Sequence, residues 1–220
     1  MSEPIQEGIL REIDEELRKD HFSEIWSRYG KILIGLAFII ISSVAGFKAW
    51  QNYDVTNRSQ LGERFASTFE LTKKGENELA LSALKSFQDE NPQGYKMLAS
   101  FRAAALMANE GNIQGAAAAY EKIANNDSLD IIYRDLAILL GTIQQMSDNE
   151  DTTTLTNVLA LLSTDKNPWR YSARELIAII AKNSGDEVKA RELFTALTDD
   201  ETTPKGIRLR AKELLTGMAK

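Results

Sequence analysis

Side chains capable of covalent or metal chemistry are scarce in this 220-residue chain. There is no cysteine, which excludes disulfides, thiolate metal sites and cysteine nucleophiles. The single histidine, His21, lies in a charged N-terminal stretch, where we expect a solvated imidazole. The sequence contains no phosphate-binding glycine loop, zinc motif or G-x-S-x-G elbow. We therefore predict a protein that is not an enzyme and needs no cofactor, metal or small-molecule substrate.

Acidic residues form the remaining candidate for cation binding. Their runs are Asp89-Glu90, Asp148–Asp151 and Asp199–Glu201. A calcium loop needs alternating oxygen ligands, a central glycine and a terminal glutamate, and none of the runs has that layout. Each run falls between stretches of helical periodicity, where acidic residues cap helix N-termini or face water. We expect caps or solvated side chains here rather than a metal site.

The overall composition indicates a helical protein that does not bind nucleic acid. The formal net charge is −6, and no cluster of lysine and arginine stands out along the sequence. Only four prolines occur, and runs of β-branched or aromatic residues are few after residue 55. These features predict an all-α fold.

One uncharged run, Ile32 to Phe47, is the most hydrophobic stretch of the chain and is bounded by Lys31 and Lys48. As a helix it covers about 24 Å, slightly less than a bilayer core of roughly 30 Å. The lysines can extend their stems to the headgroups. Aromatic residues suited to the membrane interface flank the run: Trp26, Tyr29, Trp50 and Tyr53. We predict a transmembrane helix over residues 32–50.

Two other interpretations of the run stay open. It can be a buried core helix of a soluble protein, or the apolar region of a signal peptide cleaved after the small-x-small sequence Ser43–Ala45. Secretory N-terminal regions are short and positively charged, whereas acidic residues outnumber basic ones in residues 1–31. We therefore favour a retained anchor.

The basic residues near the span favour a cytoplasmic N-terminus. Arg18, Lys19, Arg28 and Lys31 precede it, and Lys48, Arg58 and Arg64 follow it. A four-to-three excess on the N-terminal side is a positive-inside signal, although a large downstream domain translocates largely regardless of charge. We predict that the C-terminal part lies outside the cytoplasm.

The segments on either side of the span are predicted to be helical. Residues 1–31 form a charged head, in which Ile9, Leu10, Ile13 and Leu17 recur at helical spacing. This head is either a partly ordered tail or a docking helix. Residues 51–59 form a helical linker, and the helix can continue unbroken to about Lys74.

Beyond the linker the sequence repeats around three glycines. Gly75 and Gly111 are 36 residues apart, which is one repeat period. Gly111 and Gly185 are 74 residues apart, which is two periods. Each is followed by alanine at +5 and by large apolar residues at +9 and +12: Leu84 and Phe87, Tyr120 and Ile123, Phe194 and Leu197. The missing unit lies between the second and third glycines, with its helices at Tyr133–Met146 and Leu155–Leu162.

A two-helix unit around a glycine turn at this period indicates a helical-hairpin array. Glycine enters a left-handed helix cap without strain, and alanine lets the paired helices approach closely. The segments GENELALSALKSFQDENP, GNIQGAAAAYEKIANND and GDEVKARELFTALTDDETTP resemble the tetratricopeptide repeat. The resemblance implies about four hairpins over residues 60–203 and a capping helix over residues 204–220. In that cap Ile207, Ala211, Leu214 and Leu215 would cover the last hairpin, while Arg208, Arg210 and Lys212 stay in water.

Hairpin arrays commonly bind a protein segment in a groove lined by the first helix of each hairpin. Counting back from each turn, the predicted groove residues are Phe65, Phe69, Lys73, Phe101, Asn109, Ile138, Gln145, Glu175, Ile179 and Lys182, with Ala105 and Thr142 in the same rows. The alternative role of each apolar member is packing between helices. A second candidate contact face consists of Gly35, Ser42 and Gly46 on the anchor, where Ser42 and Gly46 form a small-xxx-small pair.

The whole layout resembles the ancillary SecYEG translocon subunits of the YfgM type. The resemblance is carried by the head IDEELRKDHFSEIWSRYGK, the helix ILIGLAFIIISSVAGFKAW and the repeat domain that follows. It implies a single-pass protein of the bacterial inner membrane with a periplasmic repeat domain. Its partners would be the Sec translocon, a membrane-anchored periplasmic chaperone and translocating chains. An adaptor for cytochrome maturation or cell division has the same architecture, and an anchored regulatory enzyme is a further alternative.

Overall fold

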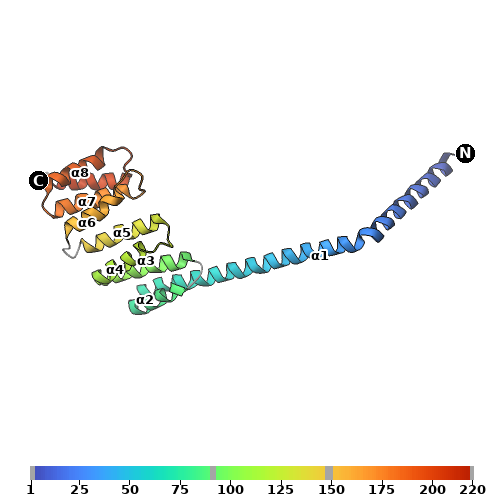
Figure 1. Ribbon diagram of the computed structural model, residues 1–220, viewed down its shortest axis with the longest axis horizontal. Helices are drawn as coiled ribbons and strands as arrows, with labels where there is room; N and C mark the ends of the chain where they lie inside the picture. Colours follow the sequence, from blue (N-terminus) through green and yellow to red (C-terminus); the bar gives the residue numbers. More distant parts are fainter. Residues whose placement is uncertain (1–2, 90–92, 147–150, 219–220) are drawn as a thin grey trace. The chain divides into compact units, whose positions relative to one another are not determined.

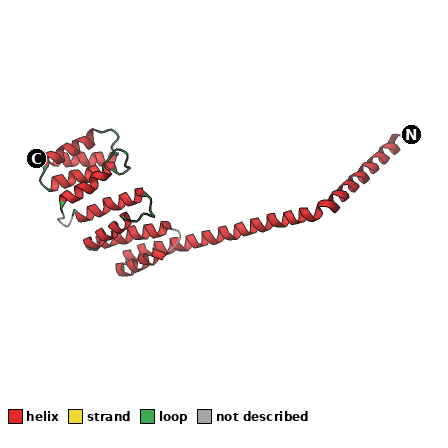
Figure 2. Cartoon of the chain, in the orientation of Figure 1, coloured by secondary structure: helices red, strands yellow, loops and turns green. Residues whose placement is uncertain are grey.

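A computed structural model of the chain describes residues 3–89, 93–146 and 151–218. All regular elements in these ranges are helices, so the predicted all-α fold is confirmed (Figure 2). They are α1 (Glu3–Lys73), α2 (Asn77–Lys85), the 3₁₀ turn η1 (Ser86–Asp89), α3 (Gln93–Asn109), α4 (Ile113–Ala124), α5 (Ile131–Gln145), α6 (Thr152–Leu162), α7 (Arg170–Asn183), α8 (Glu187–Asp199) and α9 (Lys205–Gly217) (Figure 1). The chain divides into two compact units, Met1–Gln60 and Leu61–Lys220.

Helix α1 is continuous because no proline follows Pro4 until residue 92, so each turn keeps its backbone hydrogen bonds. Its apolar side chains are exposed, with Ile32 at 65% and Phe38 at 72% of their full accessible surface. None of the residues in its most apolar 18-residue stretch is buried within the described structure. A core helix of a soluble domain would be mostly buried, so that alternative gains no support. The helix is long and apolar enough to span a membrane.

The three glycine turns adopt the predicted left-handed cap. Gly75, Gly111 and Gly185 have φ of 77°, 77° and 85°. After each glycine, the next amide donates to a carbonyl five residues earlier, which is the Schellman arrangement. These bonds, all of 2.9 Å, join Glu76 to Leu71, Asn112 to Met107 and Asp186 to Ala181. The hairpins are tight because the residue that closes one helix is also the N-cap of the next, where Asn112 and Asp186 accept amides of α4 and α8.

The repeated apolar positions form the core of the second unit. The alanines at +5, which are Ala80, Ala116 and Ala190, are all 0% exposed, and the large residues at +9 and +12 are all buried. Successive helices from α2 to α9 pack against one another, and the last turns of α1 pack against α2 and α3 (Figure 1). Pro92 follows Gly75 by 17 residues and is suited to ending the second helix of the first hairpin, but it lies outside the described residues.

The third hairpin departs from the others. Helix α5 packs more closely against α4 than against α6. Gly141 makes this possible, because a β-carbon added there would lie 3.3 Å from Cβ of Tyr120. Residues 147–150, between α5 and α6 in sequence, lie outside the described residues. The unit therefore keeps the two predicted helices while using a glycine within a helix for close packing.

Helix α9 covers the end of the array. Ile207 and Ala211 are buried, and Leu214 and Leu215 pack against the same apolar cluster. Arg210 is exposed, as predicted, but both oxygens of a carboxylate on α7 also accept hydrogen bonds from its guanidinium, a contact that was not predicted. Helical counting placed Arg210 on the outer side of α9 but gave no information on its reach toward α7.

Candidate protein-interaction face

The predicted groove residues at the start of the array lie on the last turns of α1 and on α3. Phe69 is 40% exposed, and the guanidinium carbon of Arg102 lies 3.6 Å from the centre of its ring. Phe65 packs inward, perpendicular to Phe87 with ring centres 6.1 Å apart. Phe69 is thus the accessible member of the aromatic pair, whereas Phe65 belongs to the core.

Arg102 is the central charged group of this region, and the sequence pattern did not predict it. One terminal nitrogen donates to the hydroxyl of Thr72 over 3.3 Å, while Nε is buried with no hydrogen-bond partner among the described residues. Burial lowers the pKa of Arg102, but an arginine stays protonated at neutral pH. The guanidinium therefore places a positive charge beside an exposed aromatic ring, which suits a carboxylate on a partner.

The other predicted residues at this end differ in accessibility. Phe101 is half-buried with its ring centre 6.2 Å from that of Tyr120, which makes it mainly a packing residue. Asn109 is exposed at the end of α3. Lys73 is exposed and its ammonium lies 2.7 Å from the carboxylate of Glu70. The accessible set here is Phe69, Lys73, Arg102 and Asn109, which we call the first-helix face.

The predicted residues on α5 and α7 are less accessible. Ile138 and Ile179 are half-buried against apolar clusters, and Thr142 is buried with its hydroxyl donating to the carbonyl of Ile138. Gln145 is half-buried, while Lys182 is exposed in the last turn of α7. Within the described residues, none of these side chains shares a hydrogen bond or an apolar cluster with Phe69 or Arg102.

Glu175 has a structural partner within the array. It is 7% exposed, and its two oxygens each lie 2.7 Å from a guanidinium nitrogen of Arg210. This bidentate bond raises the pKa of Arg210, since the carboxylate favours the charged guanidinium. The Glu175 carboxylate thus ties α7 to α9.

The small residues of the anchor occupy one face of α1, because their spacing of seven and four residues returns to the same side of a helix. A β-carbon added at Gly35 or Gly46 would meet nothing within 4 Å, and Ser42 is exposed. This face is open for contact with another helix, and its use as a contact surface stays a prediction.

The acidic runs that the structure describes belong to helix ends. Asp151 is the N-cap of α6, and Asp200 follows α8. Hydrogen bonds from Thr154 and Thr202 hold the pKa of Asp151 and Asp200 below the ordinary range. Among the described residues, no group of three or more acidic or histidine side chains has a geometry that could hold a metal ion.

One protein-family model matches the chain, and its description is a tetratricopeptide repeat-like domain. The match covers residues 23–211, from ahead of the apolar run to the middle of α9. No curated protein and no solved structure matches the chain. The match spans most of the sequence and agrees with the hairpins and glycine caps described above. The chain therefore belongs to the tetratricopeptide repeat-like domain family.

Proposed function

We propose that this protein is a membrane-anchored, non-enzymatic binding subunit whose helical-hairpin domain holds protein partners close to the membrane. The observation that carries the proposal is the family match, which begins at residue 23 and so includes the apolar helix together with the hairpins. Tetratricopeptide-like arrays use extended surfaces for binding other proteins. Anchoring both partners in one membrane raises their effective concentration and strengthens a modest contact.

The first-helix face supplies the groups for such a contact. Phe69 offers an exposed ring, and the charged guanidinium of Arg102 is stacked on it. Aromatic and arginine side chains contribute most of the binding energy at many interfaces. A partner segment could bind by placing an apolar side chain against the Phe69 ring and a carboxylate next to the guanidinium of Arg102.

The partner that fits the sequence best is the SecYEG translocon of the bacterial inner membrane. The support is the resemblance of the acidic head, the aromatic-flanked anchor and the repeat domain to ancillary translocon subunits of the YfgM type. In this role the N-terminus lies in the cytoplasm and the hairpin domain in the periplasm. There the domain meets translocating chains and a membrane-anchored chaperone.

The topology can be tested with a reporter enzyme that is active only outside the cytoplasm. Fused after Lys220 it should be active, and fused before Met1 it should be inactive, because a retained anchor crosses the membrane once. The mature protein should keep its head when its N-terminus is sequenced. A mature chain that begins near Gly46 would show a cleaved signal peptide and contradict the anchor.

The partner can be tested by purifying the full-length protein from membranes in a mild nonionic detergent. We expect Sec subunits or a periplasmic chaperone to be recovered with it at levels well above those seen with the anchor alone. Recovery of cytochrome-maturation or cell-division proteins instead would contradict the translocon role and favour the alternative adaptor. Recovery of no membrane protein at all would contradict the binding function itself.

A further inference from the structure

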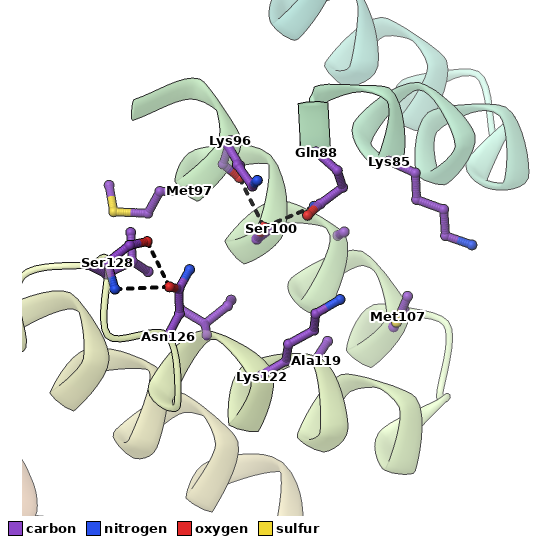
Figure 3. A pocket seen from close by; sticks show the side chains of 13 residues that line it. Lys85, Gln88, Lys96, Met97, Ser100, Met107, Ala119, Lys122, Asn126 and Ser128 are labelled. Carbon is purple, nitrogen blue, oxygen red and sulfur yellow. Dashed lines mark hydrogen bonds between the residues drawn. The ribbon is translucent and has the colours of Figure 1, made fainter. Parts of the chain in front are cut away.

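A cleft of about 560 Å³ lies on the second unit, between the end of α2 with η1, helix α3, helix α4 and the turn that follows α4 (Figure 3). On α3 the lining residues Lys96, Ser100 and Met107 follow each other at helical spacing. They are on the opposite side of the helix from Arg102 and Asn109, because a shift of two residues rotates the side chain by about 200°. This α3–α4 cleft is therefore separate from the first-helix face.

The floor of the cleft is apolar and adaptable. Met97 and Met107 from α3 are half-buried, and Ala119 and Ile123 from α4 lie beside them. Unbranched methionine side chains can adjust to apolar partners of irregular shape. The volume falls within the range of about 300–1,000 Å³ that is common for ligand sites, so it can hold several apolar side chains.

The rim of the cleft is basic. Lys85 from α2, Lys96 from α3 and Lys122 from α4 are among its lining residues, and the described residues that line it include no acidic side chain. Within the described part of the chain, none of these lysines forms an ion pair. Three free ammonium groups around one cleft contrast with the net charge of −6 for the whole chain.

The neutral polar side chains of the cleft are already hydrogen-bonded to the protein. Gln88 donates to the hydroxyl of Ser100 over 3.2 Å, and that hydroxyl donates to the carbonyl of Lys96 over 2.9 Å. The side-chain oxygen of Asn126 accepts from both the amide and the hydroxyl of Ser128 (Figure 3). The lysines are thus the groups of the cleft that stay available to a partner of opposite charge.

We propose that the α3–α4 cleft binds an acidic amphipathic helical segment of a partner protein. The segment would place its apolar side chains on the methionine floor and its carboxylates against the lysine rim. Helices commonly bind in grooves in this way, and complementary charge around an apolar centre sets orientation and excludes basic competitors. The cleft is a second docking surface, and it does not depend on which partner occupies the first-helix face.

The test uses the full-length protein in nanodiscs of zwitterionic lipid and a labelled synthetic peptide. The peptide is an amphipathic helix with a leucine stripe flanked by glutamates, and its fluorescence anisotropy reports binding above that to empty nanodiscs. We expect it to bind more tightly than the same peptide with lysine in place of glutamate. The triple variant Lys85→Glu, Lys96→Glu and Lys122→Glu should weaken binding by about tenfold or more, because three attractive contacts become repulsive.

A matched control separates the cleft from general electrostatic attraction. Lys74→Glu, Lys166→Glu and Lys189→Glu alter three exposed lysines elsewhere and change the net charge equally, so peptide binding should stay within about twofold of wild type. Ala119→Trp fills the floor without changing charge and should also weaken binding, provided that its helical content is intact. The proposal is overturned if the control triple variant weakens binding as much as the cleft variant, or if the cleft variant binds normally.

Two further arms distinguish peptide binding in the cleft from lipid binding and from binding at the first-helix face. Vesicles with acidic phospholipid should bind the wild type and the cleft variant alike; selective loss in the cleft variant, with peptide binding unchanged, would assign the lysines to lipid and overturn the proposal. Phe69→Ala should leave peptide binding unchanged, because Phe69 belongs to the first-helix face. A loss with Phe69→Ala would place the peptide there and overturn the assignment to the α3–α4 cleft.

Discussion

Replacing Phe194 with alanine should lower the free energy of unfolding by about 3–5 kcal/mol. Phe194 is 0% exposed and belongs to the apolar cluster that joins α7, α8 and α9. Its removal leaves a cavity that neighbours such as Ala178 and Ala190 are too small to fill. Urea unfolding of the full-length protein in nonionic detergent, followed by circular dichroism, measures the loss.

The control for this variant is Leu161→Ala on α6. Leu161 is 75% exposed, so its truncation should change the unfolding free energy by less than about 0.5 kcal/mol. Equal effects of the two variants would show that the +9 position is not the packing centre of the last hairpin. That outcome would contradict the repeat assignment on which the fold rests.

Replacing Arg210 with alanine should cost about 2–3 kcal/mol, because it leaves the buried carboxylate of Glu175 without its partner. Breaking a fully buried pair typically costs about 3–5 kcal/mol. The Arg210 side chain is 58% exposed, so water screens part of the charge and the expected cost is smaller. The same urea experiment measures the change.

Two further variants distinguish the ion pair from a general effect of charge on α9. Lys212→Ala removes an exposed cation from the same helix and should cost less than about 0.5 kcal/mol. The double variant Arg210→Met with Glu175→Leu should recover much of the stability lost by Arg210→Ala, since no buried charge is left unpaired. If the double variant were as unstable as Arg210→Ala, the loss would come from packing of the arginine stem instead.

The hairpins could be predicted because their determinants are local. A left-handed cap demands glycine, and the close approach beyond it demands alanine five residues later, so Gly185 and Ala190 specify one hairpin within a short segment. The apolar run of α1 could also be recognised from the sequence, because about 24 Å of uncharged helix approaches the thickness of a bilayer core. The membrane orientation remains a prediction.

Contacts between distant helices could not be predicted in the same way. Arg102 stacks on Phe69 and Arg210 reaches Glu175 across 33 and 35 residues of sequence, and helical counting gives no register between such helices. The lysines of the α3–α4 cleft come from three different helices and do not form a basic cluster along the sequence, so the sequence alone did not indicate the basic rim. These contacts depend on how the helices pack against one another, which the helix propensity of each segment does not determine.

Binding of a membrane partner to the first-helix face is tested most directly by co-purification of full-length Phe69→Ala in mild detergent, with Leu79→Ala on α2 as the control. Both residues are exposed and apolar, at 40% and 59% of full accessibility. Circular dichroism melts must show that each variant is folded at the temperature of purification.

We predict that Phe69→Ala loses most of the recovered Sec subunits or chaperone, while Leu79→Ala retains them. Gly46→Leu on the anchor should have little effect on recovery if the face dominates recognition. The contradictory result is a folded Phe69→Ala protein that retains its partners like wild type while Gly46→Leu loses them. Recognition would then reside in the membrane helix rather than in the hairpin domain.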